Sequence, residues 1–379
     1  MHNFIRCAIK TIFFIISNIY ALPCYMVWMT LLTPLRLLAP SLYWKMEAFM
    51  FRMLQCMVVT WLDPLGYKVL ECGDDIRLLQ DQEAIILCNH QSTADTPIIM
   101  LASHNKGMAA GNTMWIMFIL FKYTNFGLIS WHREDFFIDQ GRDVRNSQLE
   151  KLKEHLIKSY LPHKRKWIIV FPEGGFLHKR LESSQNYARK NGFPVLQHTT
   201  LPRFGAMKII LDTVGEPYTG PGDSSDSPTP SNEQDHQIED SSHPLKWIID
   251  ITLAYKDGQS LDMLGMCLGL CPQKDVLLHY RAYRAKDIPR DDAGLTRWLY
   301  DRYVEKDQML DYYYKNGQLP QEVLAQQHLL PQMKTSYLQF DIIQQILIHT
   351  FCVVSCYVHY IYILKPVIAI VYYFLSFIF

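Results

Sequence analysis

A histidine and an aspartate, five positions apart, are the residues of this sequence best suited to acid–base chemistry. His90 follows the short apolar run 84–88, and Asp95 comes five residues after it. If a strand turns into a helix here, the carboxylate can hydrogen-bond one imidazole nitrogen, fix the tautomer and stabilise the imidazolium. The other nitrogen is then free to take a proton from a substrate. The alternative is a helix cap beside a core histidine, with Asn89 and Gln91 among the capping side chains.

The sequence around this pair offers no obvious serine or cysteine nucleophile. A histidine–aspartate pair alone therefore predicts that the acceptor substrate supplies the nucleophile. A thioester donor is already activated, so a general base acting on an acceptor hydroxyl would suffice. These residues favour acyl transfer to a hydroxyl group.

A second group of residues is typical of a site that binds an oxyanion or a phosphate. Glu173, Gly174 and Gly175 follow the apolar run 167–171 and Pro172. Consecutive glycines after a strand let backbone N–H groups approach an anion closely. Glu173 could accept a hydrogen bond from an acceptor hydroxyl or orient a neighbouring base. The alternative is an ordinary turn.

Four basic residues are candidates for holding a phosphate. Lys179 and Arg180 follow the two glycines, whereas Arg142 and Arg203 lie in separate windows, DFFIDQGRDVR and TTLPRFGAMK. Arginine can grip a phosphate through two parallel hydrogen bonds. Arg142, with Arg145 near it, could equally be a charge at the start of a helix, and Arg203 could be a surface residue.

The elements that must position these residues alternate between strand and helix. The runs 84–88 and 167–171 are short and continuously apolar, as strands covered on both faces are. The runs 247–255 and 276–283 have the composition of later strands, and 148–160 has leucines at helical spacing. Strands separated by helices predict an α/β fold with a mixed sheet and flanking helices.

Both ends of the chain predict helices in a membrane. Residues 11–32 carry no charge over 22 positions, with Pro23 as a predicted kink, and a second apolar and aromatic stretch covers 46–62. A cleaved signal peptide is the alternative, but the first run is long and the second stretch follows it. Residues 342–379 hold one strongly charged residue, Lys365, and predict two short membrane helices or one broken helix.

These patterns divide the chain into three predicted parts: N-terminal membrane-embedded helices at 1–62, an α/β catalytic domain at 63–335, and C-terminal membrane helices at 340–379. Within the domain, 215–244 has almost no apolar residues and many Ser, Pro, Asp and Gly, which predicts a disordered loop.

Composition narrows the range of partners. Lysine plus arginine and aspartate plus glutamate are each 37 of 379 residues, so no net charge favours a nucleic acid. Two pairs of the nine cysteines have three residues between them, Cys267/Cys271 and Cys352/Cys356, but neither has a matching second Cys/His pair at zinc-finger spacing. We therefore expect no metal and no bound cofactor, whereas the oligomeric state has no signal in the sequence.

Four windows together resemble the glycerolipid acyltransferases of the lysophosphatidic acid acyltransferase type. NHQSTAD matches that family's NHxxxxD motif at Asn89, His90 and Asp95, and FPEGG (171–175) matches the start of its FPEGTR motif. FFIDQGR and LPRFGA are similar to its other two blocks, and the likeness is greatest to a lysophosphatidylglycerol acyltransferase subgroup. The chain departs from the family at three positions, which hold Gln140, Gly175 and Phe176.

The resemblance implies roles for these residues. His90 would be the general base and Asp95 its orienting carboxylate. Asn89, Glu173 and the two glycines would contribute to substrate binding, together with a cation from the four candidates. It also implies acyl-CoA as co-substrate, a lysophospholipid acceptor such as lysophosphatidylglycerol, and residence in the endoplasmic reticulum membrane. The alternatives are lysophosphatidylethanolamine or a monoacylglycerol as acceptor, or a catalytically silent membrane scaffold.

Overall fold

The structure is a computed structural model. It describes residues 2–60, 67–141, 143–220, 244–325, 329–339 and 341–376. Most of the predicted disordered loop, residues 221–243, lies outside these ranges, and so do Arg142 and the predicted boundary between residues 62 and 63. The start of that loop is described, where Glu216 N–H donates to the Leu245 carbonyl at 3.0 Å.

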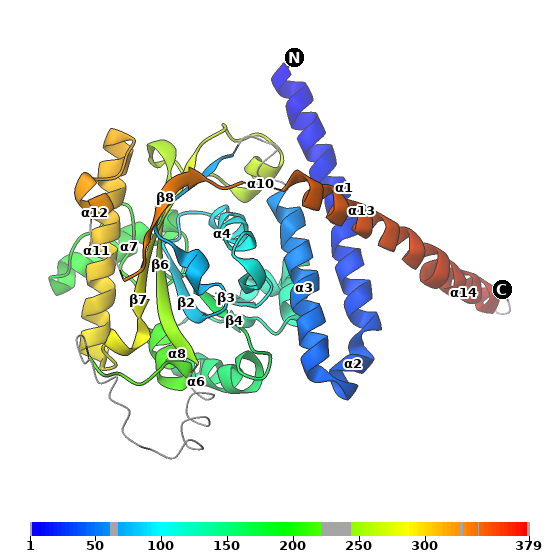
Figure 1. Cartoon of the computed structure of the whole chain (residues 1–379), viewed down its shortest axis with the longest axis horizontal. Helices are drawn as coiled ribbons and strands as arrows, with labels where there is room; N and C mark the ends of the chain where they lie inside the picture. Colours follow the sequence, from blue (N-terminus) through cyan, green and yellow to red (C-terminus); the bar gives the residue numbers. More distant parts are fainter. Residues whose placement is uncertain are drawn as a thin grey trace.

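The centre of the molecule is a mixed sheet of eight strands among the described residues (Figure 1). Its order is β4-β3-β5-β2-β6-β7-β1-β8. Neighbours from β4 through to β6 run parallel, as do β7 and β1, whereas β6 pairs with β7 and β1 with β8 antiparallel. The strands are β1 (Val69–Asp74), β2 (Glu83–Cys88), β3 (Thr113–Phe118), β4 (Phe136–Ile138), β5 (Trp167–Val170), β6 (Leu245–Tyr255), β7 (Val276–Arg284) and β8 (Gln332–Tyr337).

Helices cover both faces of this sheet, which explains the continuous apolar runs. In β2, Ile86 packs in one core cluster with α4, and Ile85 and Leu87 pack in another with α6 and α8. Alternate residues of a strand point to opposite faces, so a strand covered on both sides needs apolar residues at every position. The predicted α/β class, with a mixed sheet and flanking helices, is confirmed.

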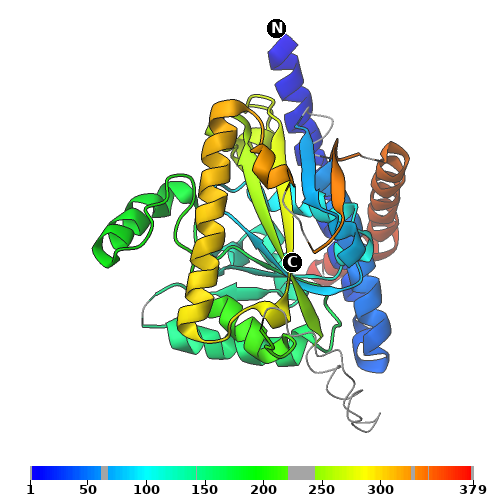
Figure 2. The ribbon, with the colours of Figure 1, turned by 60° about the vertical axis from the view of Figure 1, so that its left-hand side comes forward.

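Figure 2 shows the sheet between α11 on one side and the N-terminal helices on the other. The helices of the body are α4 (Asp95–His104), α5 (Asn125–His132), α6 (Arg145–His155), α7 (Leu177–Asn191), α8 (Gly205–Val214), α10 (Met263–Cys267), α11 (Asp292–Asn316) and α12 (Gln321–Ala325).

The N-terminal helices α1 (His2–Leu31), α2 (Thr33–Leu38) and α3 (Pro40–Val59) pack against one another and against the C-terminal helix α13 (Ile342–His359). A π-helical turn, Tyr360–Leu364, joins α13 to α14 (Lys365–Leu375). Pro366 follows in the first turn of α14, and because proline has no backbone N–H it cannot donate the usual helical hydrogen bond.

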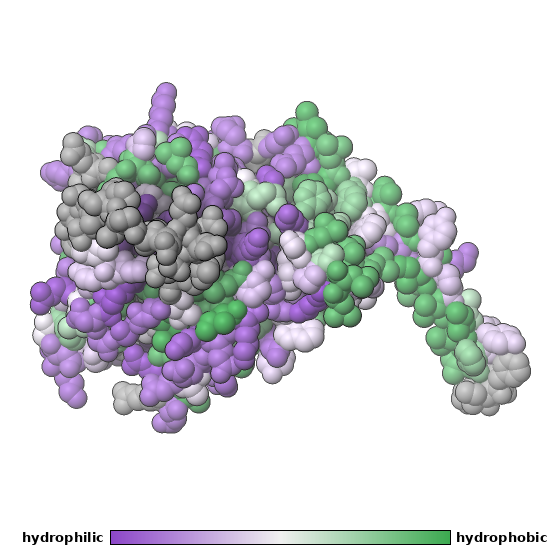
Figure 3. All heavy atoms as spheres, turned by 60° about the horizontal axis from the view of Figure 1, so that its bottom comes forward, coloured by the Kyte–Doolittle hydropathy of each residue, from purple (hydrophilic) through white to green (hydrophobic). Residues whose placement is uncertain are grey.

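Two of these helices are long and apolar enough to cross a membrane, judged by length and composition within the described ranges. They cover Cys7–Leu31 and Ile342–Leu375, and only 28% and 22% of their most apolar windows are buried. Figure 3 shows the C-terminal helices projecting as an apolar arm from a polar body. Such exposure is unlike the core helix of a water-soluble domain and agrees with the membrane helices expected at both ends.

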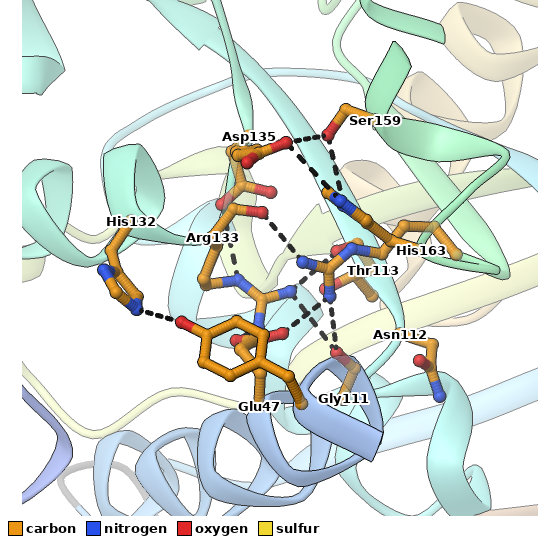
Figure 4. Close-up of polar contacts among 12 residues, drawn as sticks. Glu47, Gly111, Asn112, Thr113, His132, Arg133, Asp135, Ser159 and His163 are labelled. Carbon is orange, nitrogen blue, oxygen red and sulfur yellow. Dashed lines mark hydrogen bonds and ion pairs between the residues drawn. The ribbon is translucent and has the colours of Figure 1, made fainter. Parts of the chain in front are cut away.

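A buried cluster of charges fastens α3 to the catalytic body (Figure 4). The Glu47 carboxylate, which is fully buried, accepts hydrogen bonds from Arg133 at 2.5 Å and from Arg165 at 2.9 Å. Tyr25 of α1 also donates to Glu47, at 2.8 Å. Buried charges without partners are strongly destabilising, so the N-terminal helices and the body are held in one fixed relation.

Candidate active site

His90 and Asp95 lie side by side where β2 ends and α4 begins. The two are joined by a hydrogen bond of 2.9 Å between His90 Nδ1 and Asp95 Oδ2. The Asp95 side chain is fully buried, whereas 13% of the His90 side chain is exposed. An ionised carboxylate can only accept, so Nδ1 carries the proton and Nε2 is left free to take one. The structure thus brings together the two residues that the sequence singled out.

Four donors hold the Asp95 carboxylate in place. Oδ2 accepts from His90 and from the backbone N–H groups of Gln91 at 2.6 Å and Ser92 at 2.9 Å. Oδ1 accepts from the Tyr255 hydroxyl at 2.5 Å. These four hydrogen bonds fix the position of the carboxylate beside the imidazole.

Two aromatic rings pack against the His90 imidazole. Phe171 is stacked on it with ring centroids 4.0 Å apart, and the Phe176 ring lies 4.5 Å away at a tilt. Phe176 stands where the related family has arginine, so that position supplies an apolar wall here rather than a cation. The imidazole is therefore confined to a narrow slot and held in one orientation.

Asn89, expected to contribute to substrate binding, bonds to the neighbouring strand. Its amide donates to the Leu253 carbonyl at 2.9 Å and accepts from the Leu253 N–H at 2.8 Å. Gln91 donates to the same carbonyl at 3.1 Å and to the Tyr314 hydroxyl at 2.9 Å. Both amides hold the loop after β2 on β6, and that loop carries the histidine.

Glu173 is buried behind His90 and bridges two loops. Its Oε1 accepts from the His90 backbone N–H at 2.7 Å, and Oε2 accepts from the Thr200 N–H at 3.1 Å and hydroxyl at 2.9 Å. Burial raises the pKa of Glu173 to about 8, while these hydrogen bonds oppose the rise. Of the two roles open to Glu173 in the sequence, the contacts in the structure are those of a residue that positions the base.

Arginines surround the turn that contains the two glycines. Gly174 has φ of +68°, and its carbonyl accepts from Gln140 at 2.8 Å and from Arg180 at 3.1 Å. A Cβ on Gly174 would lie 3.3 Å from the Arg203 guanidinium, and one on Gly175 would lie 2.9 Å from Arg180 Nε. Glycine at both positions allows the two guanidinium groups to approach the backbone closely.

Arg145 joins Arg180 and Arg203 in one cluster of positive charge. Burial lowers the pKa of Arg203, and the charges of Arg180 and Arg145 lower it further. Within the part of the chain that the structure describes, none of the three forms an ion pair with a carboxylate. Three like charges without a counter-charge are the electrostatic setting in which an anion binds.

The other predicted cations are placed differently. Lys179 is exposed, with Nζ 5.7 Å from the centre of the Phe176 ring, and it lines a pocket together with Ser92 and Asp262. Arg142 lies outside the described residues. The structure therefore groups Arg180 with Arg203 at the glycine turn and puts Lys179 on a separate wall near the histidine.

Sequence reasoning missed Tyr255, Thr200 and the part played by Gln140. Gln140 was noted as a departure from the family, and in the structure it also accepts a hydrogen bond of 2.5 Å from Arg180. Its position in the motif was the signal that could have found it. Tyr255 and Thr200 had no such signal, because nothing near them in the sequence marks contact with the motif residues.

Comparison with known proteins gives matches along most of the chain. Residues 70–207 match the family model described as Acyltransferase, and residues 267–342 match the one described as Acyltransferase C-terminus. The chain is 38% identical over 341 residues to human acyl-CoA:lysophosphatidylglycerol acyltransferase 1, with 90% of each chain covered. It is 41% identical to the mouse protein of that name, with 81% of each covered. It is also 27% identical to a putative 1-acyl-sn-glycerol-3-phosphate acyltransferase of Caenorhabditis elegans, over 94% of this chain and 85% of the relative.

Proposed function

We propose that this protein moves an acyl group from acyl-CoA to the free hydroxyl of a lysophospholipid such as lysophosphatidylglycerol. The starting point is its family: the chain belongs to the acyltransferase family and is an acyl-transferring enzyme. The observation that carries the proposal is the His90–Asp95 pair close to a turn flanked by Arg180 and Arg203, which form no ion pair with a carboxylate among the described residues. A base without an enzyme nucleophile requires an acceptor with its own hydroxyl, and an arginine cluster fits an acceptor with a phosphate.

The reaction proceeds in two proton transfers on His90. Nε2 removes the proton of the acceptor hydroxyl as its oxygen attacks the thioester carbonyl of acyl-CoA. The tetrahedral intermediate then collapses, the carbon–sulfur bond breaks, and the departing CoA sulfur takes the proton from the imidazolium. The products are an ester and free CoA. The Asp95 carboxylate stabilises the positive imidazolium between these two steps.

The acceptor phosphate would lie at the glycine turn. Arg180 and Arg203 flank Gly174 there, and an anion between them would relieve the repulsion that lowers the pKa of Arg203. Asn89 and Glu173 would serve substrate binding indirectly, by fixing the loop that presents the base. Lys179 and Arg142 remain candidates for contacts with the rest of the acceptor or with CoA, which carries phosphates of its own.

A bilayer location agrees with this acceptor. A lysophospholipid has one acyl chain and is drawn from a membrane, and the described part of the protein includes two helices with the length and composition of membrane spans. We place the enzyme in the endoplasmic reticulum membrane, embedded by both ends. Acyl-CoA is a co-substrate, and the proposed reaction requires no bound cofactor.

The test uses purified full-length protein in phospholipid vesicles with radiolabelled acyl-CoA. The acceptors are lysophosphatidylglycerol, lysophosphatidylethanolamine and a monoacylglycerol, each with the wild type, His90→Ala and Asp95→Ala. We expect transfer to a lysophospholipid by the wild type alone, with thermal unfolding temperatures that remain close. Transfer to the monoacylglycerol only would show that the acceptor is a monoacylglycerol and not a lysophospholipid. Absence of transfer to all three acceptors would favour a catalytically silent scaffold. Full activity in either variant would refute the role of His90 as general base and of Asp95 as its partner.

A further inference from the structure

A short apolar segment, residues 260–271, connects β6 to β7 and contains α10. No charged residue occurs between Met263 and Leu270. Met266 and Cys267 point into the core and are 1% exposed. Three large apolar side chains of the segment instead face outward, with 39%, 58% and 70% of their surface exposed: Met263, Leu264 and Leu270. Grouped apolar exposure of this kind marks a surface that binds something other than water.

The 260–271 segment is fastened to the first membrane helix candidate. The Cys7 thiol of α1 donates to the Gly269 carbonyl at 3.1 Å. Gly269 has φ of +71°, and a Cβ there would lie 2.4 Å from Cδ of Lys10, so only glycine allows α1 to come this close. In the same part of α1, Ile9 and Ile12 are 63% and 56% exposed. The 260–271 segment therefore packs beside the N-terminal part of α1, a helix that also exposes large apolar side chains (Figure 1).

The same segment also borders the catalytic pair. The Met263 N–H donates to the Thr93 hydroxyl at 3.0 Å, and Thr93 lies in the loop between His90 and Asp95. Residues 260–262 line a pocket with Ser92, Thr93 and Phe176. The Phe176 ring, on the opposite wall, is the one that packs 4.5 Å from the His90 imidazole. One segment thus contacts both α1 and the loop that carries the base.

We propose that the 260–271 segment inserts Met263, Leu264 and Leu270 into the surface layer of the bilayer beside α1, and that the acceptor lipid moves past it into the pocket next to His90. The occupant is the bilayer rather than a partner protein, because the exposed side chains belong to a segment that packs directly on a helix whose length and composition suit a lipid environment. The passage of the acceptor rests on the proposed function, whereas contact with lipid does not.

The first experiment measures lipid contact directly. The full chain, with Leu264→p-benzoylphenylalanine or Leu270→p-benzoylphenylalanine, is reconstituted in vesicles of radiolabelled phosphatidylcholine and irradiated. The control is Tyr187→p-benzoylphenylalanine, 52% exposed on α7, on the side of the sheet away from α1 (Figures 1 and 2). We expect lipid label at both leucine positions and little at the control. Equal label at all three positions, or a protein cross-link in place of lipid in native membranes, would overturn the proposal.

The second experiment measures acceptor entry. Leu264→Ser combined with Leu270→Ser should raise the KM for a long-chain lysophospholipid in vesicles about tenfold and leave the KM for a short-chain, water-soluble one unchanged. An unchanged ratio of the two KM values would refute entry past this segment. If the wild type acylates no acceptor, the proposed function fails, while the cross-linking result still decides the lipid contact.

Discussion

Removing the Tyr255 hydroxyl tests whether Asp95 works through a fully bonded carboxylate. Tyr255→Phe deletes the 2.5 Å hydrogen bond to Oδ1 and leaves that buried oxygen without its donor from β6. Burial raises the pKa of Tyr255 well above its ordinary value, so the hydroxyl donates at every pH of interest. A hydrogen bond to a charged group contributes about 1.5 to 3 kcal/mol, and if it is used in the transition state its loss lowers kcat about 10- to 150-fold.

The same geometry predicts which kinetic constant changes. KM for the acceptor should change little, because Tyr255 is fully buried and cannot touch a substrate.

The assay is steady-state acyl transfer between about pH 5 and about pH 9, with thermal unfolding measured on the same samples. Tyr280→Phe is the matched control, because Tyr280 is another buried tyrosine of the sheet that donates to a buried carboxylate, Glu71, at 2.6 Å. Both variants should lose stability, but only Tyr255→Phe should lose kcat. Wild-type kcat in Tyr255→Phe would refute the reasoning.

Three further predictions concern charged residues. Arg180→Ala should raise the KM for a phosphate-bearing acceptor about 10- to 150-fold in steady-state kinetics, whereas Arg189→Ala on the same helix should not. Burial raises the pKa of Glu173 from 4.5 to about 8, so stability should fall as pH rises between these values, and Glu173→Gln should abolish that fall in thermal unfolding. Glu47→Gln removes the buried carboxylate that pairs with Arg165 and leaves Arg133 with Asp135 at 3.5 Å, so it should cost about 3 to 5 kcal/mol in denaturant unfolding. Glu154→Gln, in an exposed pair, should leave stability nearly unchanged.

The sequence predicted the parts of the site that depend on local order. His90 and Asp95 are five positions apart at a strand-to-helix turn, so their contact follows from the path of one short loop. The strands at 84–88 and 167–171 were predictable because burial on both faces demands unbroken apolar runs. The mixed sheet followed from the alternation of strands and helices. The roles of these residues in catalysis remain predictions.

The residues that hold His90 and Asp95 in place lie on strands that neighbour β2 in the sheet but are distant in the sequence, and no local sequence pattern reveals such neighbours. β2 lies next to β6, although β6 begins more than 150 residues later, and this pairing delivers Tyr255 to Asp95. The cation at the glycine turn was ambiguous for a similar reason. Arg180 lies four positions after Phe176, about one helical turn, and its side chain reaches back to Gly174. Only the direction of α7 distinguishes it from Lys179, which precedes it in the chain.

The buried cluster around Glu47 also sets an order of events during synthesis. The partners of Glu47 are Arg133 and Arg165, which leave the ribosome 86 and 118 residues later. At about 5 to 20 residues per second, the carboxylate waits roughly 6 to 24 seconds for its second arginine. Until the first of the two arginines, Arg133, has emerged, Glu47 has neither arginine partner, which disfavours deep insertion of α3 in hydrocarbon. We therefore expect α3 to stay close to the membrane surface until the body has formed and its arginines pair with Glu47.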